Sequence, residues 1–258
     1  MASAIMGGLL ARGTPPQHLV VVEPLEAARE QLRTRFGVHA HPASGAFLQD
    51  CAAVVWAVKP QTFRDAAILT QAFTRDALHV SVAAGIRSDT LAQWLHSERI
   101  VRAMPNTPAL IGQGISGLFA RGAVSPADKE RVHALMACTG AAIWLDDEAQ
   151  IDAVTALSGS GPAYVFFFLE AMRDAGLAMG LTAHQAYQLA VATFSGASAL
   201  AATSDEGPEV LRQRVTSKGG TTYAAITAME SSGIKPAFEA AMQAARARAA
   251  QMGDEFGA

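Results

Sequence analysis

The first 148 residues alternate short β-branched runs with stretches in which apolar residues recur every three or four positions. The β-branched runs predict strands at residues 19–23, 53–58, 78–83, 100–104 and 115–120. The amphipathic stretches predict helices at residues 26–36, 62–73, 89–95 and 126–138. This alternation is typical of βαβ units, so we expect an α/β fold with a doubly wound parallel sheet and helices on both faces.

The strand signal stops near residue 149, where Ala-rich segments separated by Gly, Ser and Pro begin. These segments predict helices at residues 150–157, 162–179, 183–202, 208–216, 221–230 and 236–252. The change divides the chain into an α/β domain, residues 1–148, and an all-α domain, residues 149–258. Residues 164–169 are apolar on every side of their helix, and a small helical domain covers such a helix poorly alone. We therefore expect a second subunit to cover it.

The composition describes a globular protein with a sizeable core. Of the 258 residues, 50% are hydrophobic and 17% are charged. The net charge of −3, without any basic run, argues against nucleic acid or an anionic membrane as a partner. Apolar stretches such as residues 163–169 are far shorter than the roughly 18 residues that a membrane span requires.

The two cysteines, Cys51 and Cys138, stand apart from any CxxC motif or Cys/His cluster. We expect both to be buried thiols that act as small hydrophobic residues, and we expect no metal site. Together with the lack of a membrane span, reduced thiols predict a soluble protein of the cytoplasm.

Four strand ends carry the first candidate site. Ligands of doubly wound sheets bind beyond the carboxyl ends of the strands, and small residues and prolines stand there. Each run alone is compatible with an ordinary turn, whereas their combination at one edge favours a flat ligand. The runs are Glu23-Pro24, Val58-Lys59-Pro60-Gln61, Ala84-Gly85 and Pro105-Asn106-Thr107-Pro108.

A second candidate site is the run Ser217-Lys218-Gly219-Gly220-Thr221-Thr222, directly before a predicted helix. Its glycines permit close approach of a ligand, and first-turn N–H groups favour a carboxylate or phosphate. The alternative is a Gly-rich turn in which a threonine caps the helix. The run Ser158-Gly159-Ser160-Gly161-Pro162 is more typical of a helix start. Because no Ser/His/Asp set or metal-ligand spacing occurs, a reaction carried by a cofactor is favoured.

Several runs resemble the pyrroline-5-carboxylate reductase family, and together they extend over nearly the whole chain. The most specific is Val215-Thr216-Ser217-Lys218-Gly219-Gly220-Thr221-Thr222-Tyr223-Ala224-Ala225-Ile226, with Pro208 and Leu211 before it and Met229-Glu230 after it. Similar to the family in the same order are Ala57-Val58-Lys59-Pro60, Val82-Ala83-Ala84-Gly85, Arg102-Ala103-Met104-Pro105-Asn106-Thr107-Pro108 and Leu157-Ser158-Gly159-Ser160-Gly161-Pro162-Ala163-Tyr164.

The resemblance implies reduction of L-Δ1-pyrroline-5-carboxylate to L-proline with NADPH or NADH, the last step of proline biosynthesis. It also implies a Rossmann-like domain followed by an all-α dimerisation domain, and a homodimer or higher homo-oligomer. The residues implied to line the dinucleotide are Val58, Lys59, Pro60, Ala84, Gly85 and Asn106. Those implied to hold the substrate are Ser217, Gly219, Gly220, Thr221 and Thr222.

Two of these residues have more specific expected roles. The Thr222 hydroxyl would meet the substrate's ring nitrogen and polarise or orient it, although an isolated hydroxyl is not a strong acid. Glu23 ends a predicted strand where an acidic residue binds the ribose hydroxyls of NAD and repels the 2′-phosphate of NADP. We therefore expect NADH to be used at least as well as NADPH, unless Glu23 points into solvent.

Two alternatives to the reductase stay open, and one of them concerns the start of the chain. Residues 1–10 have the pattern of the helix that follows a Rossmann glycine loop, so we expect the first strand and that loop, about ten residues, to be missing. Either an internal methionine has been taken as the start of the chain, or the chain is a truncated, reductase-like binding or regulatory protein without efficient cofactor chemistry. The other alternative is a related imine or β-hydroxyacid reductase. A hydroxyacid reductase would need a lysine as general acid at the Gly-Gly-Thr-Thr run.

Overall fold

The computed structural model describes residues 1–256, and the chain forms two compact units. The sheet unit comprises Met1–Gly161 and the C-terminal segment that starts at Ala244, and the helical unit comprises Pro162–Gln243. The predicted boundary at 148/149 marks the change from strands to helices. The division into functional domains at that boundary stays a prediction.

The elements of the sheet unit are α1 (Ala2–Ala11), β1 (Val21–Val22), α2 (Glu26–Phe36), β2 (Ala40–His41), β3 (Ala53–Trp56), α3 (Pro60–Thr70), β4 (Leu78–Ser81), α4 (Ser88–Leu95), β5 (Ile100–Met104), β6 (Gly114–Ala120), α5 (Pro126–Met136), β7 (Gly140–Trp144) and α6 (Gln150–Val154). The remaining helices are α7 (Gly161–Ala178), α8 (Ala183–Ala202), α9 (Pro208–Arg214), α10 (Thr221–Ser231) and α11 (Ile234–Phe256). The fold class predicted from the sequence, α/β followed by helices, is confirmed.

The strands form two sheets, one of order β3-β4-β5-β6-β7 and one of β1 with β2. Strands β3, β4 and β5 are parallel, as are β1 and β2, but β5 and β6 are antiparallel. The prediction of a wholly parallel sheet is therefore wrong at β6. Residues 105–113 connect β5 to β6, and so short a connection cannot hold the crossover that parallel neighbours need.

The sequence also missed two strands. β2 has only two residues, and β7 has the sequence Gly-Ala-Ala-Ile-Trp, in which β-branched residues are scarce. β7 occupies the outer edge of the five-stranded sheet beside β6, so its pairing rather than its propensity determines its conformation. The expected strand 19–23 is shorter in the structure, where β1 contains only Val21–Val22.

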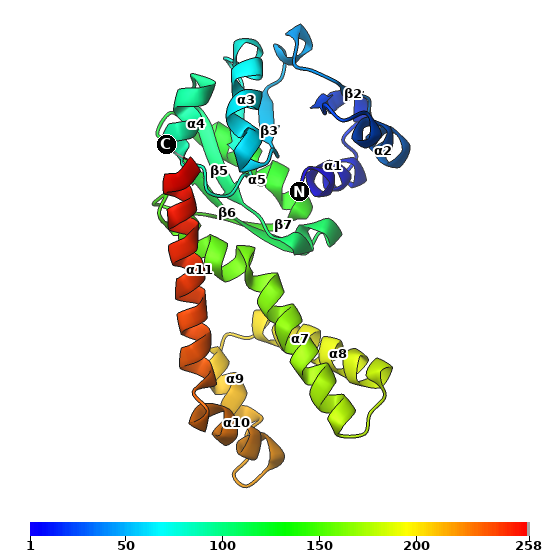
Figure 1. Cartoon of the computed structure of the whole chain (residues 1–258), viewed down its shortest axis with the longest axis vertical. Helices are drawn as coiled ribbons and strands as arrows, with labels where there is room; N and C mark the ends of the chain where they lie inside the picture. Colours follow the sequence, from blue (N-terminus) through cyan, green and yellow to red (C-terminus); the bar gives the residue numbers. More distant parts are fainter. Residues whose placement is uncertain (257–258) are drawn as a thin grey trace. The chain divides into compact units, whose positions relative to one another are not determined.

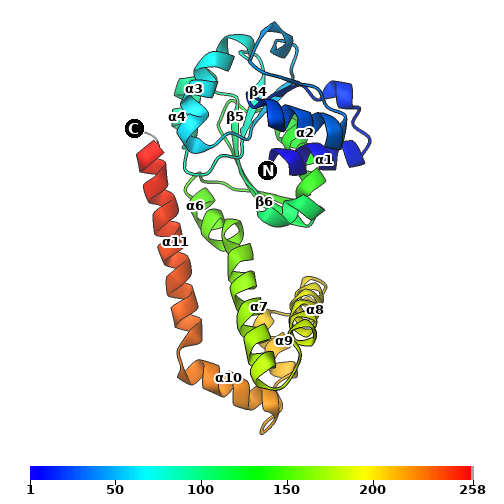
Figure 2. The same cartoon turned by 45° about the vertical axis from the view of Figure 1, so that its right-hand side comes forward.

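Two hydrophobic clusters cover opposite faces of the five-stranded sheet. α3 and α4 pack on one face, where Phe63 and Leu91 are fully buried. On the other, α1 and α5 contribute Ile5 and Met136 to a cluster with strand residues such as Val101. Figures 1 and 2 both show α3 and α4 on the side of the sheet opposite to α1 and α2. This arrangement agrees with the predicted doubly wound plan.

Helix α1 makes unusually close contact with the short helical turn before β7. A Cβ atom on Gly8 would lie 2.4 Å from the carbonyl oxygen of Cys138, so only glycine fits there. Arg12 Nη2 donates to the Ala137 carbonyl at 2.6 Å, and Cys138 Sγ donates to the Ile5 carbonyl at 3.5 Å. Cys138 is buried as predicted, whereas Cys51 is only half-buried, which corrects that expectation.

The helical unit buries few of its apolar side chains. α8 begins with a capping box in which Thr182 and Gln185 satisfy each other's backbone N–H groups. The apolar side chains of α7 and α8 nonetheless remain open to solvent in the single chain. Exposed examples are Val165, Phe166, Phe167, Met172, Tyr187, Leu189 and Leu200.

Candidate active site

The carboxyl ends of β3, β4 and β5 form one edge of the sheet, because these three strands are parallel. Six of the predicted cofactor residues follow these strands directly, within a few residues of each strand end. They are Val58, Lys59, Pro60, Ala84, Gly85 and Asn106. The structure therefore brings three of the four predicted strand-end runs to one edge, whereas Glu23-Pro24 follows β1, which belongs to the other sheet.

The side chain of Asn106 has a defined orientation. The backbone N–H of Ile115 donates to Asn106 Oδ1 at 3.0 Å. The Nδ2 amino group consequently points away from β6, and it has no hydrogen-bond partner among the described residues. Asn106 can therefore present two donors to a ligand beyond the end of β5.

The starts of α1 and α3 are among the helix starts of the sheet unit that lack a capping side chain. Lys59 precedes α3 without a side-chain cap, and Pro60 occupies the first helical position, where it needs no donor. At α1 the Met1 side chain also makes no cap, so the N–H groups of Ala2 and Ser3 have no intrahelical acceptor. Such groups, with the helix dipole, are suited to bind phosphate oxygens.

Glu23 follows β1, and its carboxylate is held in a local turn. Its backbone N–H donates to the His41 carbonyl at 2.9 Å, which extends the β1–β2 pairing. The N–H of Leu25 donates to Glu23 Oε1 at 2.9 Å. Arg29 Nη1 donates to the carbonyl oxygens of Glu23 and Pro24 at 2.9 and 2.6 Å. Glu23 is half-buried rather than directed freely into solvent.

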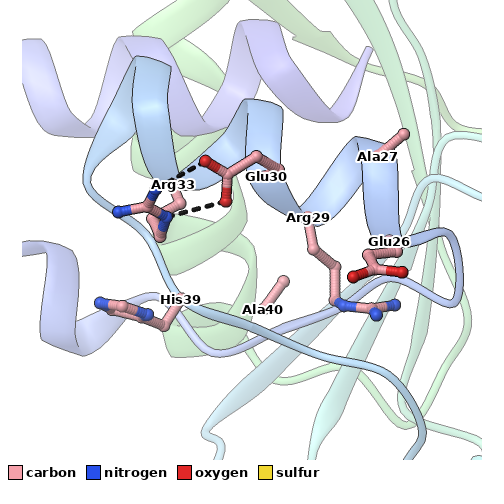
Figure 3. A pocket seen from close by; sticks show the side chains of 7 residues that line it. All are labelled: Glu26, Ala27, Arg29, Glu30, Arg33, His39 and Ala40. Carbon is pink, nitrogen blue, oxygen red and sulfur yellow. Dashed lines mark hydrogen bonds and ion pairs between the residues drawn. The ribbon is translucent and has the colours of Figure 1, made fainter.

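A pocket of about 490 Å³ lies between α2 and β2, next to this turn. It contains none of the predicted site residues, and its charges are mixed. Figure 3 shows Arg33 paired with Glu30 on one side of the pocket and Arg29 beside Glu26 on the other. Because Arg29 also binds the Glu23 carbonyl, the pocket adjoins the carboxyl end of β1.

The predicted substrate run ends at the start of α10 in the helical unit. Gly219 has a left-handed backbone with φ of +77°, and Gly220 is the N-cap residue. No side chain caps this helix, so the alternative of a threonine N-cap is wrong. Gly220 N–H donates to the Ser217 carbonyl at 3.0 Å, whereas the N–H groups of Thr221 and Thr222 lie in the first helical turn, where no intrahelical acceptor exists. This turn can receive an anion.

The side chains around this turn differ in exposure. Thr222 is half-buried, while Ser217 and Lys218 are exposed, so Lys218 has the environment of a solvated lysine. A Cβ atom on Gly220 would lie 2.7 Å from Ser217 Oγ, so a larger residue here would have to displace the Ser217 side chain. The predicted cofactor residues belong to the sheet unit, and this turn belongs to the helical unit.

The sequence did not predict a π-helix at Thr155–Gly159, which joins α6 to α7. Ser160 N–H donates to the Thr155 carbonyl at 2.8 Å, five residues back. A Cβ atom on Gly159 would lie 2.6 Å from Met104 Cε, so this segment packs against the end of β5. π-Helical turns occur frequently at functional sites, and the Ser-Gly-Ser-Gly run was the available signal.

A buried ion pair near the same strand was also missed. Arg102 lies on β5 with 4% exposure, and its Nη1 donates to Glu148 Oε1 at 2.7 Å. The same carboxylate accepts the backbone N–H of Ser88 at the start of α4, at 2.6 Å. An arginine inside an otherwise apolar strand was the signal, since a buried cation needs a partner.

Comparisons with known proteins agree with this arrangement. The family model described as "Pyrroline-5-carboxylate reductase dimerisation" matches residues 148–252. The model described as "NADP oxidoreductase coenzyme F420-dependent" matches residues 1–85. A pyrroline-5-carboxylate reductase of Pseudomonas aeruginosa is 42% identical, with 100% of this chain and 95% of that protein aligned. The chain belongs to the pyrroline-5-carboxylate reductase family.

Solved structures of pyrroline-5-carboxylate reductases resemble the whole chain. The enzyme from Coxiella burnetii has a TM-score of 0.91 at 35% identity, over 97% of this chain and 94% of that one. The Plasmodium falciparum pyrroline carboxylate reductase, solved with NADP bound, has a TM-score of 0.86 at 27% identity, with the same coverage. Both therefore share the order of a sheet region and a helical region.

The chemistry at the strand ends fits the dinucleotide that this family uses. The starts of α1 and α3 lack side-chain caps, Asn106 presents an amino group, and Ala84 and Gly85 are half-buried residues without a large side chain. These donors suit phosphate and carboxamide oxygens. Among residues 1–256, no cluster of three His, Cys, Asp or Glu side chains could hold a metal ion. None of the helices in this part of the chain is long and apolar enough to span a membrane.

Proposed function

We propose that the protein reduces L-Δ1-pyrroline-5-carboxylate to L-proline with NADPH or NADH. The observation that carries the proposal is the uncapped start of α10 after the left-handed Gly219, in a chain of the pyrroline-5-carboxylate reductase family. When bound, the reduced nicotinamide supplies the hydride that adds to the imine carbon. The chain's own residues then need to align the two rings and exclude water.

The first turn of α10 holds the substrate carboxylate. Thr221 and Thr222 offer their backbone N–H groups, while that of Gly220 is already bonded to Ser217. The positive end of the helix dipole adds to this attraction for an anion. Gly219 and Gly220 allow the carboxylate to approach the backbone, and the exposed Ser217 hydroxyl can add a further donor.

The Thr222 hydroxyl orients the ring nitrogen of the substrate. A protonated imine nitrogen donates to Thr222 Oγ, which keeps the proton on the ring and the adjacent carbon electrophilic. A threonine hydroxyl is too weak an acid to deliver that proton itself. Thr222 is therefore a catalytic residue that touches substrate by hydrogen bonding and not by proton transfer.

The cofactor is held at the carboxyl edge of the sheet. Val58, Lys59 and Pro60 follow β3, Ala84 and Gly85 follow β4, and the Asn106 amino group donates beyond β5. We assign Glu23 to the ribose of the adenosine half, where its charge disfavours a 2′-phosphate. NADH is then used at least as well as NADPH.

The protein forms a homodimer through its helical unit. The dimerisation family matches this region, and α7 and α8 expose aromatic and aliphatic side chains such as Phe166, Phe167 and Leu189. A second copy would bury this apolar surface. Size-exclusion chromatography with light scattering tests this, and a monomer at micromolar concentration would contradict it. The cytoplasm stays a prediction, with which the free thiols of Cys51 and Cys138 are consistent.

The activity is tested with the purified chain, pyrroline-5-carboxylate, and NADPH or NADH. We expect the absorbance of the reduced cofactor to fall while proline accumulates in equal amount. The control replaces the substrate with a β-hydroxyacid and the oxidised cofactor. Turnover of the hydroxyacid without turnover of pyrroline-5-carboxylate would refute the proposal and favour a related reductase.

A further inference from the structure

The last turns of α11 belong to the sheet unit, although the helix begins in the helical unit. Ala249 and Gly253 are buried, and Phe256 packs against the hydrophobic cluster formed by α3, α4 and their strands. In Figure 1 this end of α11 is the red segment beside α4. The last turns of α11 therefore belong to the same unit as the sheet edge at which we place the cofactor.

The contact that matters most is with Gly85, directly after β4. Gly85 has a left-handed backbone with φ of +76°. A Cβ atom there would lie 2.9 Å from Met252 Cβ and 3.0 Å from Phe256 Cδ2. The helix therefore rests against the backbone of this loop. A left-handed glycine otherwise gives a loop high conformational freedom.

Arg87, two residues later, makes the reciprocal contact. A Cβ atom on Gly253 would lie 3.0 Å from the guanidinium of Arg87. Arg87 Nη2 donates to the Ala250 carbonyl at 3.5 Å and lies 3.5 Å from Asp254 Oδ1, and Nη1 lies 3.9 Å from Asp152 Oδ2. Because Arg87 is also the N-cap residue of α4, it connects the loop to α6 and α11.

We propose that the C-terminal turns of α11 hold the Ala84–Gly85 loop in its cofactor-binding conformation, with Met252 as the packing contact and Arg87 as a positioning residue. The inference rests on the proposed function, which places the dinucleotide at this loop. A loop that is ordered before the ligand arrives loses less entropy on binding, so the affinity for the dinucleotide is higher. Neither Met252 nor Arg87 needs to touch the cofactor.

The test substitutes Met252→Ala in the full chain and measures the equilibrium dissociation constant of NADPH and of NADH by fluorescence of the reduced nicotinamide. We expect both constants to rise about 5-fold to 10-fold, because alanine keeps the Cβ atom but lacks Met252 Cε, which lies 3.3 Å from the position of a Cβ atom on Gly85. The KM for pyrroline-5-carboxylate at saturating cofactor is expected to stay as in the unsubstituted chain. Met252→Leu, which keeps the volume, should bind like the unsubstituted chain.

The matched control is Met242→Ala, the same substitution in the part of α11 that belongs to the helical unit. It should leave dinucleotide binding unchanged. Arg87→Ala should weaken binding and Arg87→Lys should restore part of it, since the positive charge is kept. Unchanged binding in Met252→Ala, or equal losses in Met252→Ala and Met242→Ala, would overturn the inference. An unsubstituted chain that fails to bind either dinucleotide would instead overturn the proposed function, and the inference with it.

Discussion

The sheet unit and the helical unit bury their apolar residues to very different degrees. All of the largest fully buried side chains, among them Phe63, Leu78 and Leu118, belong to the sheet unit. The helical unit buries only three apolar residues among its described positions, Leu169, Ala186 and Ala190. Both units are rich in apolar residues in the sequence, so the difference lies in what covers them.

This difference indicates two sources of stability. The sheet unit is stabilised by its own core, because helices cover both faces of the sheet. The helical unit leaves Phe166 and Phe167 exposed by 58% and 68%, which a stable soluble fold avoids unless another surface covers them. Substitutions in the two units should therefore differ in whether their effect depends on protein concentration.

The largest expected effect is that of Phe63→Ala in the sheet unit. Phe63 is fully buried between α3, α4 and the sheet, and its loss should reduce the free energy of unfolding by about 3–5 kcal/mol. The measurement is urea unfolding at several protein concentrations. The reduction should be the same at each concentration, because no second chain takes part in this core.

Phe167→Ala is the matched substitution in the helical unit. The loss of stability that it causes should shrink as the protein is diluted towards the monomer, since a second chain covers this side chain only in the proposed dimer. A cost for Phe167→Ala that is as large as that of Phe63→Ala in the monomer would show that the helical unit has a core of its own. The comparison between the units would then fail.

A second prediction concerns His79 on β4. Burial lowers its pKa from 6.5 to about 4, and its Nδ1 accepts a hydrogen bond from Trp56 Nε1 at 3.0 Å. Between these pH values the unfolded chain binds the proton and the folded chain does not. Stability should therefore fall as the pH is lowered from about 6.5 towards 4, by about 3 kcal/mol from this group.

The measurement is the free energy of unfolding at pH 7.5 and pH 4.5 for the unsubstituted chain and for His79→Gln. The glutamine keeps an acceptor for the Trp56 indole but does not titrate. The loss on acidification should be smaller in the variant. An equal loss in both proteins would show that other groups cause the acid sensitivity of the sheet unit.

The third prediction concerns the helical unit's own chemistry. Thr222→Ala should lower kcat/KM for pyrroline-5-carboxylate about 10-fold or more, which corresponds to about 1.4 kcal/mol for a lost hydrogen bond. Dinucleotide affinity should barely change, because the cofactor residues belong to the sheet unit. Thr227→Ala, on the exposed side of the same helix, is the control. A 10-fold loss of dinucleotide affinity in Thr222→Ala, without a change in substrate kinetics, would assign Thr222 a purely structural role.

The smallest expected effect is on cofactor choice in the sheet unit. Glu23→Ser should raise the ratio of kcat/KM for NADPH to that for NADH about 3-fold, since a partly exposed charge interacts with a 2′-phosphate by about 1 kcal/mol or less. Glu30→Ser, which removes a carboxylate already paired with Arg33, is the control. A strong preference for NADPH that Glu23→Ser leaves unaltered would show that Glu23 does not face the phosphate.

The sequence pattern predicted most elements of both units, because each period reports which face of an element is buried. The helix 26–36 and the strand 100–104 were predicted with the bounds found in the structure. The direction of β6 could not be predicted from its own residues. Only the length of its connection to β5, nine residues, carried that information.

For the candidate site, the sequence predicted the runs but not their hydrogen bonds. It left open whether the run before α10 is an anion site or a Gly-rich turn capped by a threonine, because Thr is an acceptable N-cap residue. Within the π-helix at Thr155–Gly159, Gly159 packs against Met104, a residue more than 50 positions earlier. Such long-range contacts have no signature within a sequence window. The roles of the individual site residues therefore stay predictions.

The close fit of α1 against the turn before β7 also bears on protein synthesis. The two ends of that contact are separated by 133 residues, from Ile5 to Cys138. At roughly 5–20 residues per second, a ribosome needs about 7–27 s to make the partner after Ile5 has been made. During that interval α1 lacks its contact with the turn before β7, although Phe36 and strand residues such as Leu78 and Val101, which also pack near α1, have already been made. The packing of α1 is therefore completed only when the chain has been made as far as Cys138.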